Sequence, residues 1–381
     1  MSKALIVYAS AGAGHQKASE AVYYYLKAHC LDLDLKVIDL LDYTPKVFKL
    51  FYSRGYSLLV SKFPRVWHCF YRISFFFAEM PFLFWLDYLT CAKFIRLIES
   101  EKPDIVLSTH FLTSSVITLF KNKNPHTTLK LISVVTDYIL HPFWLGEGVD
   151  VFITSCDSVK DELLKKNIPA YKIKPFGIPV KERFYQPTQR RQIAEKLALN
   201  PDEFTALIIT GAFGFGPIEQ IVRALSGSVQ LLVVCGKNAK LYQRLQRLKL
   251  PLVKAYPLID YVDDLMSVSD VVLTKAGGLT ITESLAKGLP MIFFSSIPGL
   301  ETANEKVLCG YGAGIRTKTI SQIKKTVLSL KHNPEVYQNT VNKIKQFRKQ
   351  TTLQDIASTV TDLIKCQALQ NAHTSQVYNR L

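Results

Sequence analysis

The sequence lacks the features of a zinc ribbon, a disulfide-bonded domain and a membrane-spanning helix. Its seven cysteines are scattered, and no two are spaced as Cys-x-x-Cys. No run of about 18 uncharged apolar residues exists, since the nearest candidate, Ile73–Cys91, contains Glu79, Pro81 and Asp87. The first residues, MSKALIVYAS, open as a strand without a signal-peptide pattern. These absences predict a cytoplasmic protein with reduced thiols and no transmembrane helix.

Acidic residues are scarce relative to basic ones. The 381 residues include 47 Lys and Arg but 31 Asp and Glu, for a net charge of +16. Such a charge predicts an anionic partner: nucleic acid, a membrane surface or a phosphorylated ligand. No base-reading or stacking module is present, so nucleic acid is not expected. The excess is uneven, at +3 for residues 1–150 and +13 for residues 151–381.

Short β-branched runs alternate with helical patterns along the chain, which predicts an α/β fold with parallel sheets. All-apolar strands such as ALIVY and LIIT suit a sheet covered on both faces. Two such series predict two Rossmann-like domains, 1–179 and 180–345, and a helical tail, 346–381, packing back toward the first. The predicted strands are Lys3–Ala9, Leu35–Leu40, Asp104–Ser108, Leu129–Thr136, Val151–Thr154, Thr205–Thr210, Gln230–Cys235, Leu252–Tyr256, Val271–Thr274, Pro290–Phe294 and Gly314–Arg316.

The segment Tyr43–Ala78 breaks this rhythm. It has no acidic residue, six basic residues and twelve aromatics, among them Arg65, Trp67 and Arg72. Cations beside interfacial aromatics are typical of a surface that dips into an anionic bilayer. An ordinary helical insertion with its aromatics in the core is the alternative.

The first glycine motif, SAGAGH, follows the first predicted strand and includes Gly14 and His15. Glycines before a helix N-terminus let backbone N–H groups approach an anion. A dinucleotide fingerprint would need a third glycine where Lys17 stands. His15 is either a general base or a capping histidine.

The second glycine motif, GAFGFGPIE, contains Gly211, Gly214 and Gly216 and follows the strand LIIT. Pro217 suits the first helical position and Glu219 the third. The pattern predicts a binding site for a pyrophosphate, and the alternative is an ordinary turn between a strand and a helix.

The third motif combines a double glycine with several polar side chains. Gly277 and Gly278 follow a strand that ends at Thr274, and Thr280-x-x-Glu283 matches a capping box. A carboxylate near an anion seat can instead accept hydrogen bonds from a ribose diol. Glu301 and Asn304 follow a Pro-Gly turn and either face a sugar or belong to a solvated loop.

Together with TDYILHPFW, FGIPV and VVCGKN, these motifs resemble the family 28 glycosyltransferases, and among them the bacterial processive diacylglycerol glucosyltransferases and the monogalactosyldiacylglycerol synthases. The resemblance covers about residues 3–330. It implies the GT-B architecture, two Rossmann-like domains with a cleft between them. Two motifs of the plant-type monogalactosyldiacylglycerol synthases, GGGEG and AGPGT, are replaced by other residues in this sequence. The resemblance therefore leaves both glucose and galactose open as the donor sugar.

The resemblance also implies roles for individual residues. His15 is the favoured catalytic base, with Asp137 as the alternative. The residues that the resemblance places on the acceptor and membrane side are His110, His141, Trp144, Arg65, Trp67 and Arg72. The donor side is assigned Gly14, Gly211, Gly214, Gly216, Lys237, Lys275, Gly277, Gly278, Leu279, Thr280, Glu283, Glu301 and Asn304.

The implied activity is inverting transfer of a hexose from a UDP-sugar to 1,2-diacylglycerol, at the inner face of the cell membrane. The UDP-sugar is a substrate, and no cofactor is expected. No His, Cys and Asp cluster has metal-ligand spacing, so metal-independent catalysis is expected. The alternatives are transfer of N-acetylglucosamine to another lipid, a nucleotide-sugar 2-epimerase, and a non-enzymatic UDP-sugar-binding protein.

Overall fold

The computed structural model describes residues 1–10, 12–55, 59, 63–77, 81–187 and 189–378. Within these ranges, side chains are described except at 53, 54, 64, 65, 76, 77, 81–85 and 369–378. The chain forms two compact units. The N-terminal unit comprises Met1–Glu182 and Thr351–Leu381, and the C-terminal unit comprises Arg183–Gln350.

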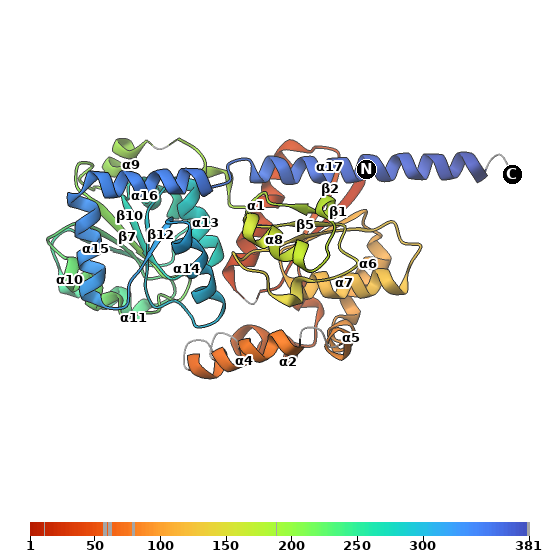
Figure 1. Cartoon of the computed structure of the whole chain (residues 1–381), viewed down its shortest axis with the longest axis horizontal. Coiled ribbons are helices and arrows are strands. Elements are labelled where there is room, and N and C mark those ends of the chain that lie inside the picture. Colours follow the sequence, from red (N-terminus) through yellow and green to blue (C-terminus); the bar gives the residue numbers. More distant parts are fainter. Residues whose placement is uncertain (11, 56–58, 60–62, 78–80, 188, 379–381) are drawn as a thin grey trace. The chain divides into compact units, whose positions relative to one another are not determined.

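The N-terminal unit contains a parallel six-stranded sheet in the order β2-β1-β3-β4-β5-β6 (Figure 1). Five strands confirm predicted ones, and β6 was not predicted because two residues give no hydrophobic pattern. The strands are β1 (Ser2–Tyr8), β2 (Leu33–Asp39), β3 (Ile105–Ser108), β4 (Lys130–Val134), β5 (Val151–Ile153) and β6 (Ile173–Lys174).

The C-terminal unit contains a second parallel sheet, in the order β12-β11-β10-β7-β8-β9. All six strands were predicted. They are β7 (Thr205–Ile209), β8 (Gln230–Val234), β9 (Val253–Tyr256), β10 (Val271–Thr274), β11 (Met291–Phe293) and β12 (Gly314–Arg316). Parallel pairing brings the carboxyl ends of neighbouring strands to one edge of each sheet, which is where open α/β sheets bind ligands.

Helices cover both sheets. Those of the N-terminal unit are α1 (Ala13–His29), α2 (Lys46–Leu50), α4 (Pro64–Phe77), α5 (Pro81–Thr90), α6 (Ala92–Glu101), α7 (Phe111–Lys123), α8 (Asp157–Lys165) and α17 (Thr352–Tyr378), with short turns η1 (Leu40–Tyr43), η2 (Phe51–Gly55), η3 (Pro142–Trp144) and η4 (Ala170–Lys172). Those of the C-terminal unit are α9 (Arg190–Lys196), α10 (Ile218–Leu225), α11 (Ala239–Leu248), α12 (Val262–Ser267), α13 (Gly278–Lys287), α14 (Leu300–Gly310), α15 (Ile320–His332) and α16 (Pro334–Phe347); η5 (Glu182–Phe184) joins the units.

The core of the N-terminal unit explains why its strands read as continuous apolar runs. Leu5, Ile6 and Val7 are all fully buried because helices cover both faces of the sheet. Each such side chain contributes about 1.5–3 kcal/mol on burial. On one face, Ile356 and Val360 of α17 pack with residues of α1, so the end of the chain completes the core of the first unit.

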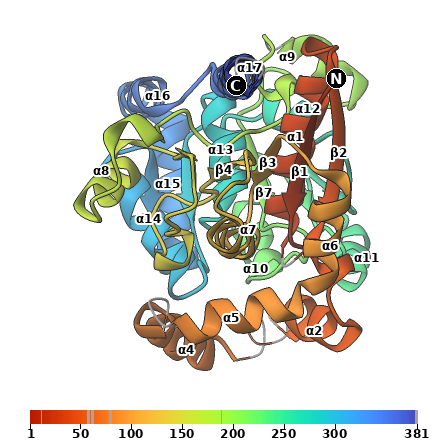
Figure 2. The ribbon, with the colours of Figure 1, turned by 90° about the vertical axis from the view of Figure 1, so that its right-hand side faces the viewer.

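The aromatic-rich segment forms a separate helical layer of the N-terminal unit. In Figures 1 and 2, α2 and α4 lie beyond the carboxyl edge of the sheet. Contacts anchor this layer: the ring centroids of Phe75 and His141 are 4.5 Å apart, and those of Tyr52 and His110 are 5.9 Å apart. Since His110 follows β3 and His141 follows β4, the layer lies over the predicted ligand-binding edge.

Candidate functional site

His15 occupies the first turn of α1, at the carboxyl end of β1. Its Nδ1 lies 2.7 Å from the carbonyl oxygen of Thr109 and 3.1 Å from Oγ1 of Thr136. A carbonyl oxygen can only accept, so Nδ1 carries the proton of the neutral ring and Nε2 keeps its lone pair. Burial lowers the pKa of His15, and the bond to Thr109 opposes part of that shift. The ring is thus held neutral, in the tautomer of a general base.

A second neutral histidine lies beside the first, in the opposite tautomer. The ring of His110 is 4.6 Å from that of His15, edge to face. Its Nδ1 accepts a hydrogen bond of 3.1 Å from the backbone N–H of Leu112 and caps α7. The proton of the neutral ring is therefore on Nε2. Burial, and then the neighbouring His15, hold the pKa of His110 well below its usual value. The two rings together offer one proton acceptor and one proton donor.

The loops that hold these rings are tied by hydroxyl groups. Oγ1 of Thr109 donates to the carbonyl of His15 at 3.0 Å and lies 2.9 Å from Oγ of Ser19. Sequence reasoning missed Thr109 and Thr136 as supports. A signal was present, because Thr109 and Thr136 are polar residues one and two positions after buried strands, where a parallel sheet gathers its loops.

His141 fastens the aromatic layer to the sheet. Its Nδ1 accepts from the backbone N–H of Phe143 at 3.2 Å, so Nε2–H donates to Oγ of Ser74 at 2.9 Å. Ser74 in turn donates to the carbonyl oxygen of Tyr71. Burial lowers the pKa of His141 to about 4, which keeps the ring neutral. This chain of bonds holds one face of α4 against the loop after β4.

The other residues assigned to this side lie in different surroundings. Asp137 is partly buried near Tyr71, and its charge adds to burial in raising the pKa of the Tyr71 hydroxyl. Trp144 is buried and contacts the ring of Phe111, whereas Trp67 is partly exposed and Arg72 is exposed. The side chain of Arg65 lies outside the described part of the structure.

The outer face of the aromatic layer is apolar and exposed. Val66, Phe70 and Ile73 follow the spacing of one helix face on α4 and are 45%, 60% and 49% exposed. Val47 and Phe51, before α4 in the chain, are 79% and 77% exposed. Exposed apolar side chains along one helix face are typical of an interaction surface.

In the C-terminal unit, the glycine loop after β7 packs directly on the loop after β8. Gly211, Gly214 and Gly216 all have positive φ. A Cβ at Gly214 would lie 2.4 Å from the carbonyl oxygen of Cys235, so only glycine fits there. Pro217 is the residue before α10 and not its first, because the backbone of Pro217 is still non-helical. Glu219 pairs with Arg223 and Arg244 and does not form a cap.

The double glycine opens α13 earlier than the capping-box interpretation expects. α13 begins at Gly278 with Gly277 as its cap and no side-chain cap bond, so Thr280 lies inside the helix and the capping box is wrong. Leu279 and Thr280 are partly exposed in the first turn, and Glu283 is buried one turn further on. The backbone N–H of Gly277 already donates to the carbonyl of Lys275 at 2.8 Å, so the N–H groups that this helix start offers an anion are those of its first turn, from Gly278 on.

The partly exposed Lys275 and the buried Glu301 and Asn304 form a support beside that helix start. Nζ of Lys275 lies 2.5 Å from Oε1 of Glu301, whose Oε2 accepts from the backbone N–H of Ile297 at 2.8 Å. Nδ2 of Asn304 donates to the carbonyl of Ala276 at 3.2 Å. Glu301 and Asn304 are buried in α14, so the solvated-loop alternative is wrong. Lys237 is exposed, with Nζ 5.9 Å from the ring centroid of Phe213.

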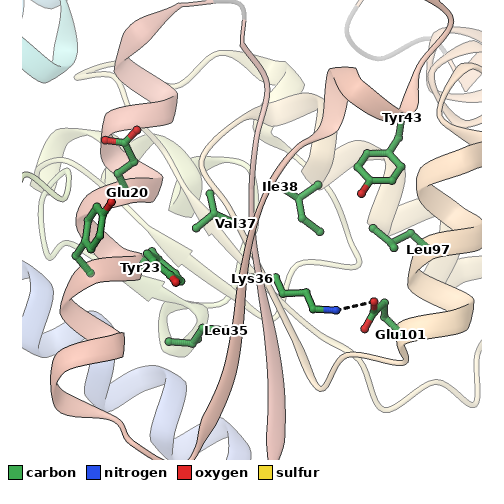
Figure 3. Close-up of a pocket in the computed structure, with 10 residues that line it drawn as sticks. Glu20, Tyr23, Leu35, Lys36, Val37, Ile38, Tyr43, Leu97 and Glu101 are labelled. Atoms are coloured by element: carbon green, nitrogen blue, oxygen red, sulfur yellow. Dashed lines mark hydrogen bonds and ion pairs between the residues drawn. The ribbon is translucent and has the colours of Figure 1, made fainter.

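A groove of about 570 Å³ lies along the edge strand β2, between α1 and α6 (Figure 3). Lys36 reaches across it and donates to Glu101 at 2.7 Å. The other lining residues are Glu20, Tyr23, Tyr24, Leu35, Val37, Ile38, Tyr43 and Leu97. His15 is not among them, so this groove is separate from the histidine pair.

Within the described ranges, no group of three or more His, Cys, Asp and Glu side chains is arranged to hold a metal ion. No helix in the part of the chain that the structure describes is long and apolar enough to span a bilayer.

Two family models match the chain. Residues 15–180 match the model of monogalactosyldiacylglycerol (MGDG) synthase, and residues 205–360 match the glycosyltransferase family 28 C-terminal domain. The first match begins at His15 and includes the whole aromatic layer.

Among curated proteins, a processive diacylglycerol beta-glucosyltransferase of Bacillus pumilus is 28% identical over 376 residues, 95% of this chain and 96% of that protein. The protein of Glycine max named "Probable monogalactosyldiacylglycerol synthase, chloroplastic" is 29% identical over 347 residues, 85% of this chain and 64% of that protein.

Solved structures agree with the GT-B fold. MurG of Acinetobacter baumannii has a TM-score of 0.62 at 14% identity, covering 95% of this chain and 100% of that one. The glycotransferase of kitacinnamycin has a TM-score of 0.66 at 14% identity, covering 95% and 99%.

Proposed function

The chain belongs to glycosyltransferase family 28, and from this premise we propose that it moves a hexose from a UDP-sugar to the free hydroxyl of 1,2-diacylglycerol. Relatives similar over most of the chain bear the names of diacylglycerol glucosyltransferase and MGDG synthase. The observation that carries the proposal is the tautomer of His15. Its unprotonated Nε2 belongs to a ring in the first turn of α1, 4.6 Å from the ring of His110, which in turn contacts Tyr52 of the aromatic layer.

His15 serves as the general base. Its Nε2 takes the proton of the lipid hydroxyl as the hydroxyl oxygen attacks the anomeric carbon. The bond between that carbon and the phosphate oxygen breaks, UDP leaves with the electron pair, and the configuration inverts. The bond from Nδ1–H to the Thr109 carbonyl strengthens as the ring becomes charged, which stabilises the imidazolium. Asp137 remains the alternative base.

His110 places a hydrogen-bond donor beside that base. Diacylglycerol carries an ester carbonyl next to its free hydroxyl, and Nε2–H of His110 is suited to donate to it. The donated bond would orient the acceptor so that its hydroxyl faces His15.

The C-terminal unit binds the donor. Gly211, Gly214 and Gly216 and the start of α13 offer backbone N–H groups to the diphosphate. Lys275, held by Glu301, and Lys237 add positive charge where the leaving UDP gains negative charge. These groups supply the stabilisation for which other transferases use a bound metal. The carboxylate of Glu283 would accept hydrogen bonds from the hydroxyl groups of the donor.

The exposed apolar face of α4 and its neighbours brings the enzyme to the inner surface of the membrane. Phe70 and Ile73 would enter the headgroup region, and Arg72 would face anionic lipids. Peripheral binding of this kind gives the base access to a substrate that does not leave the bilayer.

The test is product formation. Purified protein is incubated with diacylglycerol in anionic vesicles and radiolabelled UDP-glucose or UDP-galactose in parallel, and the lipids are identified by mass spectrometry. We expect a hexosyl-diacylglycerol to form with one of the two donors, and that donor identifies the transferred sugar. If neither donor yields a glycolipid, the lipid acceptor is wrong.

A further inference from the structure

The C-terminal unit carries its own exposed aromatic pair, on the glycine loop after β7. Phe213 and Phe215 are 45% and 40% exposed, and their rings stack with centroids 5.6 Å apart. Gly214 stands between them with a φ of 58°, a conformation that turns the chain tightly. Two large apolar rings held together in water cost free energy unless a partner covers them.

The stretch of chain that contains this pair is basic. Residues 211–250 contain six basic residues and one acidic residue, Glu219, which is already paired with Arg223 and Arg244. On α11, Lys240, Arg244 and Arg247 are exposed and follow the spacing of one helix face. Lys237, before that helix, has its ammonium 5.9 Å from the centre of the Phe213 ring.

The aromatic loop and the basic helix are joined into one surface. Asn238 caps α11 by accepting from the backbone N–H of Leu241 at 3.0 Å, and its amide donates to the carbonyl of Gly214 at 3.3 Å. The backbone N–H of Lys237 donates to the carbonyl of Ala212 at 2.8 Å. The start of the basic helix is therefore fixed next to the two phenylalanines.

We propose that Phe213, Phe215 and the basic face of α11 form a lipid-docking surface on the C-terminal unit, which binds an anionic bilayer. Phenylalanine enters the headgroup boundary, and each cation near an anionic leaflet adds about 1 kcal/mol of attraction. The surface is distinct from the exposed face of α4, because it belongs to the unit that binds the donor. The inference rests on the proposed function in one respect, since that function places the substrate in a membrane.

Vesicle partitioning tests the surface with two double variants. K240Q/R247Q removes two cations that touch no assigned donor residue, and we expect its affinity for phosphatidylglycerol-containing vesicles to fall on the order of 30-fold. F213S/F215S should lower affinity for the same vesicles by tenfold or more, as roughly expected for withdrawing two partly inserted rings. The matched controls are K324Q/K325Q, exposed on α15, and L258S, 56% exposed elsewhere in the unit; both should partition like the wild type.

UDP affinity, measured by calorimetry, separates the outcomes. Loss of vesicle affinity in both double variants, with UDP affinity retained by K240Q/R247Q, supports the proposal. Wild-type partitioning of K240Q/R247Q overturns it, as does an F213S/F215S variant that loses UDP affinity but not vesicle affinity. Partitioning needs no turnover, so a wild-type protein that makes no glycolipid refutes the proposed function and leaves this test intact.

Discussion

Replacement of His15 by alanine gives the sharpest test of the catalytic assignment. A general base contributes about 10²- to 10⁴-fold to a rate, which corresponds to roughly 3–5 kcal/mol. Burial lowers the pKa of His15 below its usual value near 6.5, so at about pH 7.5 nine-tenths or more of the wild-type rings are neutral. The variant therefore loses nearly the full contribution, and the wild-type kcat/KM falls only on the acid side, below about pH 6.5.

Thr136→Val is the graded companion to that variant. It removes the hydroxyl 3.1 Å from Nδ1 but leaves the shorter bond to Thr109, so we expect a loss of about 2- to 12-fold, the worth of one hydrogen bond. Initial rates of glycolipid formation with diacylglycerol vesicles measure both variants, and calorimetry checks that UDP binding is kept. A His15→Ala enzyme within tenfold of the wild-type kcat would refute the base assignment and favour Asp137.

Three further predictions concern stability and donor binding. Burial lowers the pKa of His141 to about 4 in the folded protein, against about 6.5 in the unfolded chain, so the unfolded chain binds more protons between these pH values. The free energy of unfolding that is present above pH 6.5 should therefore fall by roughly 3 kcal/mol as the pH is lowered through this range. Urea denaturation at several pH values should show a flatter dependence on pH for His141→Gln. Lys275→Met should weaken UDP binding about 10- to 100-fold by calorimetry, and an unchanged affinity would reduce Lys275 to a structural partner of Glu301. Gly214→Ala should destabilise the fold by about 1–3 kcal/mol, because the φ of Gly214 is positive and the added Cβ would clash with a backbone carbonyl. The control is Gly12→Ala, which should not lower the melting temperature because the space around Gly12 is open.

Local patterns were reliable where one local requirement dominated. Runs such as Ala4–Tyr8 are apolar at every position because both faces of a parallel sheet are covered. Short β-branched runs that alternate with helical patterns identified eleven of the twelve strands in the described part of the chain. Helix starts were less predictable. The capping-box pattern at Thr280 and Glu283 is real in sequence, but the helix begins two residues before Thr280, because the two glycines can adopt the helix entry without a side-chain cap. No local signal announced that Glu301 and Asn304 would be buried.

The sequence by itself determined the two parallel sheets, the glycine turns at their carboxyl ends, the aromatic-basic segment and the family. Each of these depends on residue type and near-neighbour spacing, which the chain carries locally. Only the tertiary structure decided the proton positions on the histidines and the pairing of Lys275 with Glu301. The two groups that contact Nδ1 of His15 lie 94 and 121 positions away in the chain, and the folded sheet brings them within 3.1 Å; the nearer in sequence, the Thr109 carbonyl, sets the tautomer. A tautomer depends on which atom faces each ring nitrogen, and that contact exists only once distant strands have paired.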